Sequence, residues 1–364
     1  MEFDLNVLTR TEKRIFALRT LYSKAGYSPY RMLKFEDYDL YSRNKDFLVS
    51  DRVITFTDTN GRLKALKPDV TMSLVRNIKD RPGELQRLYY DENVYRVSGS
   101  THQFKEILQT GLECIGDLDG YDVCEVVTLA AASLATVSEN YALDISHMGL
   151  LAAVMEASGF SREDQKLAME YLHRKNYHQL KTLCNDEVSW EKLSQVAACH
   201  GGWQELEALA KVLTTPAEQQ ALAQLRQLWK ILEETGCGDS IRLDFSVGNN
   251  MGYYSGVVFK GYLEGIPASV LSGGQYDKLP RKMGRKARAI GFAVYLGLLE
   301  NRSLQEDAFD VDTLIFHDGT ADPLELMRAS QEAAAVGTVL VTGELPQGRN
   351  WKILRQFEKG AWVK

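Results

Sequence analysis

The chain has 364 residues, of which 45% are hydrophobic and 25% are charged. This length predicts about two or three folding units with a buried core, which excludes a mainly disordered chain, a collagen-like chain and a small disulfide-stapled scaffold. Forty-three Lys and Arg residues against 49 Asp and Glu give a net charge of −6. An acidic total argues against bulk, sequence-independent nucleic-acid binding, although it leaves a local basic groove open.

The first third of the chain predicts an antiparallel sheet with helices rather than βαβ repeats. A helix is expected from an N-cap at Thr11 to a stop at Gly26. Asn60-Gly61 predicts a hairpin turn between the β-type runs 52–57 and 63–66. The other expected elements are a strand at 30–35, a helix at 69–78, and a pair of strands at 88–97 and 104–115.

The middle of the chain is rich in Leu, Ala, Glu, Gln and Lys, which favours helices. One helix is expected at 122–140, and several more within an insertion at 148–235. Later expected elements are strands at 241–247, 253–262 and 268–272, a helix at 288–301, a linker near 301–310, and a small α/β unit with strands at 313–316 and 338–341 around a helix at 323–335. The predicted division is 1–147 and 236–305 for the core, 148–235 for the helical insertion and 306–364 for the α/β unit.

Several kinds of site lack their signature in the sequence. The five cysteines have no metal-site spacing, so they are expected to be reduced thiols in a cytoplasmic protein; they are Cys114, Cys124, Cys184, Cys199 and Cys237. There is no phosphate-loop, dinucleotide-binding or zinc-protease motif, so neither a cofactor nor a metal is expected. The N-terminus does not read as a secretory signal, and no stretch approaches the roughly 18 apolar residues of a membrane helix.

Several polar residues lie within the predicted strands or at their edges. Gln109, Gly111 and Glu113 alternate along one strand, so their side chains are expected on one face. Burying a Gln and a Glu on an otherwise apolar sheet costs folding free energy unless a ligand or a partner completes their hydrogen bonds. Alternatively, these two side chains lie on a solvated face, or they are buried and the backbone completes their hydrogen bonds. Tyr253 and Tyr254 are expected to face opposite sides, so that only one of them enters a pocket.

Four ordered motifs make the chain, over residues 5–300, resemble the class II aminoacyl-tRNA synthetase catalytic fold, and specifically histidyl-tRNA synthetase. The matching stretches are 66–71, 94–96 followed by 109–113, 252–259, and 272–277 leading to 289–293. The resemblance implies an α+β fold in which helices flank an antiparallel sheet.

The resemblance also implies a site for histidine. It places Asp69, Thr71 and Gln109 around the α-amino group of histidine and Glu113 and Tyr254 at the imidazole. Tyr276 would line the same pocket, and Arg96 keeps a position that contacts the α-phosphate of ATP in the family. These assignments suit the ligand, because an ammonium prefers a carboxylate and neutral acceptors, and an imidazole pairs with an acid and a hydroxyl.

Three departures bear on the activity that the resemblance implies. Ser98 stands where the family has a Glu that reads adenine, Asn249 where it has an Arg at the reacting carboxylate, and Leu298 where an Arg backs the ATP. Neither Asn nor Leu replaces a charged, planar guanidinium, so amino-acid activation is not expected.

A histidine pocket without nucleotide contacts resembles the regulatory subunit of short-form ATP phosphoribosyltransferase. That subunit is a catalytically inert relative of histidyl-tRNA synthetase. It assembles with the short catalytic subunit, supports its activity and mediates feedback inhibition by histidine at the first step of histidine biosynthesis. The resemblance therefore implies a homodimer within a hetero-oligomer. Leu33, in place of a motif-1 proline, leaves the details of dimer packing open.

Two other functions stay open at this point: an active histidyl-tRNA synthetase with divergent ATP contacts, and an RNA-linked binding module that reuses the fold. The basic run 281–288 is expected to be a solvated loop before a helix, although it could touch a phosphate, RNA or an acidic partner. Residues 310–364 are too few for an anticodon-binding domain of about 100 residues, so tRNA is not expected as a partner.

Overall fold

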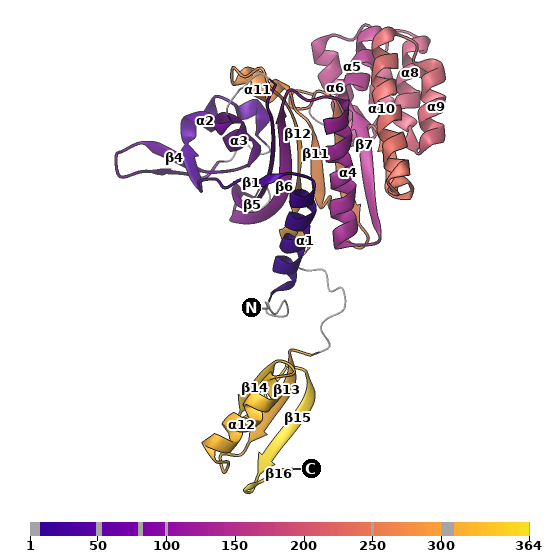
Figure 1. Cartoon of the computed structure of the whole chain (residues 1–364). Coiled ribbons are helices and arrows are strands. Elements are labelled where there is room, and N and C mark those ends of the chain that lie inside the picture. The colour runs from indigo at the N-terminus through magenta and orange to yellow at the C-terminus, as the bar shows by residue number, and fades with distance from the viewer. Residues whose placement is uncertain are drawn as a thin grey trace. The chain divides into compact units, whose positions relative to one another are not determined.

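The structure is a computed structural model that describes residues 8–48, 53–78, 83–98, 101–248, 251–299 and 309–363. The chain divides into two compact units, residues 1–301 and 302–364, which are described separately (Figure 1). Asn249 and most of the predicted linker at 301–310 lie outside the described residues.

A mixed sheet forms the centre of the first unit. Among the described residues it has nine strands in the order β1-β5-β6-β12-β11-β10-β7-β9-β8. Neighbouring strands are antiparallel except in the pairs β1–β5 and β7–β9. The strands are β1 (Ser28–Pro29), β5 (Leu85–Val97), β6 (Phe104–Gly116), β7 (Tyr141–His147), β8 (His200–Gly201), β9 (Ile241–Asp244), β10 (Val257–Leu263), β11 (Leu271–Gln275) and β12 (Arg288–Tyr295). The predicted α+β class with a largely antiparallel sheet is confirmed.

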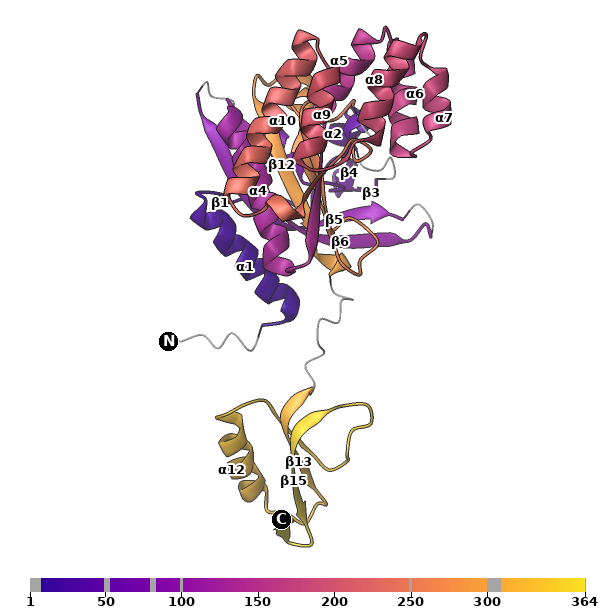
Figure 2. The ribbon, with the colours of Figure 1, turned by 90° about the vertical axis from the view of Figure 1, so that its right-hand side faces the viewer.

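Helices α1 (Arg10–Lys24) and α4 (Gly120–Val137) cover one face of this sheet, as Figure 2 shows. The N-cap of α1 is Thr9 rather than the predicted Thr11, because Thr9 and Glu12 complete a capping box. Among the described helices, α4 alone is long and apolar enough by length and composition to span a membrane, although Asp122 and Glu125 interrupt its apolar sequence. Its Ala130 and Leu134 lie in the core instead.

A second, smaller sheet precedes the helix that reaches the site. Its strands are β2 (Phe35–Asp37), β4 (Leu63–Leu66) and β3 (Thr55–Thr57), in that order. The predicted Asn60-Gly61 turn joins β3 to β4, and Gly61 takes a φ of 77°, which a residue without a Cβ adopts freely. Between and after these strands lie the helical segments α2 (Tyr38–Ser42), η2 (Lys45–Phe47) and α3 (Thr71–Asn77).

The predicted helical region follows β7, a strand that the sequence reading missed. Figure 1 shows its helices gathered beside β7. They are α5 (Met148–Ala157), α6 (Arg162–His173), α7 (Tyr177–Thr182), α8 (Glu187–Ala198), α9 (Trp203–Val212) and α10 (Pro216–Glu234), and the short segment η3 (Gly238–Ser240) leads into β9.

The predicted helix at 288–301 is wrong. Residues 288–295 form strand β12, and the segment η4 (Leu296–Leu298) follows it. The strand lies between β6 and β11 and is mostly buried, so its sequence is an almost continuous apolar run without the alternation of a half-exposed strand. The basic run 281–288 begins at the end of α11 (Lys278–Lys282) and leads into this strand rather than into a helix.

The second unit contains one helix packed on a sheet of four strands among its described residues, ordered β14-β13-β15-β16. Strands β13 (Val311–His317) and β14 (Val339–Thr342) form the predicted parallel pair, and α12 (Pro323–Ala334) is the predicted helix. Strands β15 (Trp351–Glu358) and β16 (Ala361–Val363) were missed.

Candidate functional site

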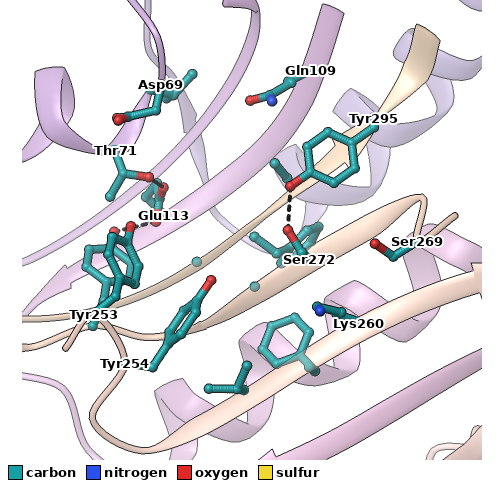
Figure 3. A pocket seen from close by; sticks show the side chains of 18 of the residues that line it. Asp69, Thr71, Gln109, Glu113, Tyr253, Tyr254, Lys260, Ser269, Ser272 and Tyr295 are labelled. Atoms are coloured by element: carbon teal, nitrogen blue, oxygen red, sulfur yellow. Dashed lines mark hydrogen bonds between the residues drawn. The ribbon is translucent and has the colours of Figure 1, made fainter. Parts of the chain in front are cut away.

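A cavity of about 450 Å³ lies on the sheet face opposite α1 and α4. Strands β6, β10, β11 and β12 form its floor, and α3 and the segment before β10 form its rim. Figure 3 shows polar side chains from these elements pointing into it. Every residue that the sequence assigned to the site lines this one cavity: Asp69, Thr71, Arg96, Gln109, Glu113, Tyr254 and Tyr276.

Glu113 is the most buried acid of the cavity, with 2% of its surface exposed. Thr71 Oγ1 donates a hydrogen bond of 2.8 Å to Glu113 Oε1, and the Tyr276 hydroxyl donates one to Oε2. Burial raises the pKa of Glu113 to about 7, although both hydrogen bonds act in the opposite direction. Glu113 can therefore either donate or accept near neutral pH, which suits an imidazole ring.

Asp69 lies where the chain enters α3, next to Pro68. Its Oδ1 accepts a hydrogen bond of 2.9 Å from the Met72 amide, so the side chain caps the first turn of the helix. Burial raises the pKa of Asp69, while this hydrogen bond and the positive charge of Arg96 oppose the shift. Arg96 is held in place by a hydrogen bond of 2.8 Å from its Nε to the Pro68 carbonyl. A carboxylate is thus fixed at the rim of the cavity.

Gln109 and Glu113 share one face of β6, as their alternation predicted, and both line the cavity. Gln109 is 3% exposed, and its side chain makes no hydrogen bond within the described part of the chain. A buried amide without a protein partner is costly unless a ligand or water completes its hydrogen bonds. The amide thus offers both a donor and an acceptor to a bound molecule.

Both Tyr253 and Tyr254 line the cavity, so the expectation that only one would do so is wrong. Strict alternation does not apply, because both residues precede the start of β10 at Val257. Their ring centroids are 4.7 Å apart, with the planes at 71°. Burial raises the pKa of each phenol, so both hydroxyls remain neutral hydrogen-bonding groups at physiological pH.

Sequence reasoning missed a second set of polar residues on the opposite side of the cavity. Figure 3 shows them beside one another: Lys260, Ser269, Ser272 and Tyr295. Ser272 and Tyr295 are hydrogen-bonded through their hydroxyls. Ser272 begins the family-like stretch 272–277, but the sequence assigns it no role in the site. Tyr295 could have been found only by recognising 288–295 as a strand.

The positions that depart from the family pattern are partly described. Leu298 is 42% exposed, and neither it nor Ser98 is among the residues that line the cavity. Within the basic run, Lys282 pairs with Asp46 at 3.0 Å, and Arg285 donates to the Arg76 carbonyl at 2.7 Å. Within the described ranges, no group of three or more His, Cys, Asp or Glu residues is placed to hold a metal.

Comparisons with known proteins identify relatives of the chain in sequence and in fold. A family model described as histidyl-tRNA synthetase matches residues 5–299. An ATP phosphoribosyltransferase regulatory subunit from Clostridium botulinum is 30% identical over 321 residues, covering 82% of this chain and 75% of the relative. A crystal structure from Bacillus halodurans C, described as an ATP phosphoribosyltransferase regulatory subunit/histidyl-tRNA synthetase, aligns with a TM-score of 0.77 at 24% identity, covering 96% and 94% of the two chains. A chain of the ATP phosphoribosyl transferase (HisG:HisZ) complex from Thermotoga maritima aligns with a TM-score of 0.63 at 18% identity, covering 81% and 98%.

Proposed function

The chain belongs to the histidyl-tRNA synthetase family, and within it to the regulatory subunits of ATP phosphoribosyltransferase, and from this premise we propose that it senses histidine in the cavity. Bound histidine would control a short-form ATP phosphoribosyltransferase catalytic subunit that assembles with this chain. The proposal places the chain in the cytoplasm, at the first step of histidine biosynthesis, as a homodimer within a hetero-oligomer.

The gathering of six polar residues around one cavity carries this proposal. Glu113 and Tyr254 would hold the two imidazole nitrogens, with Tyr276 and Thr71 fixing the Glu113 carboxylate. Asp69 and Gln109 would accept from the α-ammonium group, with Thr71 beside them. A charge-assisted hydrogen bond contributes about 1.5–3 kcal/mol, so a few such contacts suffice for binding at micromolar to millimolar concentrations.

The absence of catalysis is part of the proposal. Transfer of an adenylyl group needs positive charge around the phosphates and the reacting carboxylate. Leu298 carries no charge and lies outside the cavity lining, and the sequence has Asn249 in place of an arginine. Arg96, at a position that the family resemblance assigns to an ATP phosphate, lines the cavity. We therefore expect histidine to bind without being activated.

Partnership with a catalytic subunit is supported by the relatives. The Clostridium botulinum relative is named a regulatory subunit, and the Thermotoga maritima structure is a complex of two kinds of subunit. The test is co-purification of this chain with a short ATP phosphoribosyltransferase, followed by activity measurements as histidine is added. Glu113→Gln should preserve the complex and weaken inhibition by histidine. An unchanged response in this variant would move the effector site elsewhere.

An active histidyl-tRNA synthetase is the second candidate, and the position of Arg96 at the cavity favours it. Histidine-dependent exchange of pyrophosphate into ATP separates the two. The regulatory proposal predicts no exchange above background, whereas robust exchange would establish the ligase.

A further inference from the structure

The cavity floor carries charges of opposite sign at its two sides. The pairing of β6, β12, β11 and β10 sets Gly111 beside Ala293, Ala293 beside Ser272, and Ser272 beside Lys260. Paired residues point to the same face of a sheet, so Lys260 lies on the same face as Glu113 and Gln109. Three strand spacings of about 4.8 Å separate β6 from β10, roughly 14 Å between their backbones.

The floor between these two sides is made of residues with little or no side chain. Gly291 and Ala293 line it. At Gly291 an added Cβ would lie 1.7 Å from Glu113 Oε2, so the acid fills the space that a larger residue would need. The open floor lets the long side chains of Glu113 and Lys260 approach the same bound molecule from opposite sides, as their positions in Figure 3 indicate.

The Lys260 side chain has no hydrogen bond or ion pair with any described residue, and it is largely buried. Burial lowers its pKa, and the negative charges of Asp244 and Asp144 oppose that shift. Arg242 neutralises Asp144 through a hydrogen-bonded ion pair of 2.8 Å, and Lys175 pairs with Asp244 at 3.3 Å. Both nearby acids therefore already have cations of their own, and Lys260 faces the cavity.

Hydroxyl groups lie on the β11 side of this lysine, and its cross-strand neighbour on β7 is Asp144. Ser272 is its cross-strand neighbour and is hydrogen-bonded to Tyr295, while the Ser269 hydroxyl has no partner in the described part of the chain. An ammonium flanked by hydroxyl donors is suited to a carboxylate.

We propose that Lys260, with Ser269 and Ser272 beside it, binds the carboxylate of the amino acid in the cavity, so that the site selects an intact α-amino acid over its decarboxylated amine. This inference rests on the proposed function, because it assumes that histidine is the occupant. In this arrangement Lys260 contacts the negatively charged carboxylate of the ligand, and Glu113 contacts its ring. Side chains of β10 and β6 would then contact the carboxylate end and the ring end of the ligand, respectively.

Calorimetric titration of the full chain with histidine and with histamine, which lacks the carboxylate, tests the inference. The wild-type chain should bind histidine more tightly than histamine. Lys260→Met should weaken histidine binding about 10- to 100-fold, as expected for a charge-assisted hydrogen bond, and leave histamine binding within about threefold. Lys260→Arg should recover part of the preference. Lys166→Met, at an exposed lysine of α6, is the matched control and should change neither titration.

Equal weakening of both ligands by Lys260→Met, or no weakening of either, would overturn the inference. Failure of the proposed function gives a different result: the wild-type chain would not bind histidine at all. If the wild type binds histidine and Glu113→Gln weakens that binding while Lys260→Met does not, the histidine site stands and the carboxylate assignment falls. A thermal melt of each variant checks that it is folded.

Discussion

Thr71 Oγ1 donates a hydrogen bond of 2.8 Å to Glu113 Oε1, and thereby joins the first turn of α3 to strand β6. The two residues are 42 positions apart in the chain. The contact fixes a buried carboxyl for which no described cation lowers the pKa, and burial raises that pKa to about 7. Burying the ionised acid lowers the free energy of unfolding. The raised pKa can therefore be measured through stability, without a ligand.

Glu113→Gln should change how stability depends on pH. Below pH 4.5, the ordinary pKa of this carboxyl, the proton is bound in both the folded and the unfolded chain. Between pH 4.5 and about 7 the unfolded chain releases it first, so the folded state holds more protons and the free energy of unfolding falls as pH rises. The loss is on the order of 3 kcal/mol and is constant above that window.

Urea unfolding of the wild type and Glu113→Gln between pH 4 and 8 measures this effect, because other titrating groups cancel in the difference. The wild type should lose stability relative to the variant as pH rises through the window. Parallel curves would mean that the carboxyl titrates normally in the folded chain.

Gly291→Ala should displace Glu113. An added Cβ would lie 1.7 Å from Glu113 Oε2 and 2.5 Å from the Leu112 carbonyl, and the backbone oxygen cannot move without straining the β6–β12 pairing. We expect a loss of about 1–3 kcal/mol in the free energy of unfolding, together with weaker histidine binding. Gly297→Ala is the matched control, because no atom lies within 4 Å of a Cβ built there. Equal effects of the two substitutions would argue against the close approach.

Lys67→Met should destabilise the chain strongly. Lys67 is completely buried and forms an ion pair with Glu92, whose Oε1 also accepts a 3.0 Å hydrogen bond from the Met32 amide. Removing the lysine leaves Glu92 with a mostly buried and uncompensated charge, which costs about 3–5 kcal/mol. Chemical unfolding at pH 7 measures the loss. The double variant Lys67→Met/Glu92→Gln should recover part of it, and no recovery would mean that the lysine acts through packing alone.

The sequence predicts the residues on the Glu113 side of the cavity better than those on the Lys260 side. The alternation of Gln109 and Glu113 is local to one strand and could be read directly. Asp69, Thr71, Tyr254 and Tyr276 came from the ordered motifs of a family. Their roles toward histidine stay predictions, although all of them lie at one cavity.

Lys260 could not have been found in the same way. It follows Val258 and Phe259 in an apolar strand, where a lysine is usually a side chain that reaches for solvent. Its place in the cavity depends on the pairing of β10 with β11 and of β11 with β12, which are contacts between distant segments. The sequence of 288–301 predicts a helix, so neither that pairing nor the position of Tyr295 follows from the sequence.

The central claim is that histidine binding and subunit assembly are coupled in this chain. Calorimetric titration with histidine, performed on the chain alone and on its complex with a short ATP phosphoribosyltransferase, tests it most directly. Coupling is reciprocal, so the two histidine affinities should differ by the factor by which histidine changes subunit affinity, typically about 5- to 150-fold. Equal affinities in the two titrations would contradict the account.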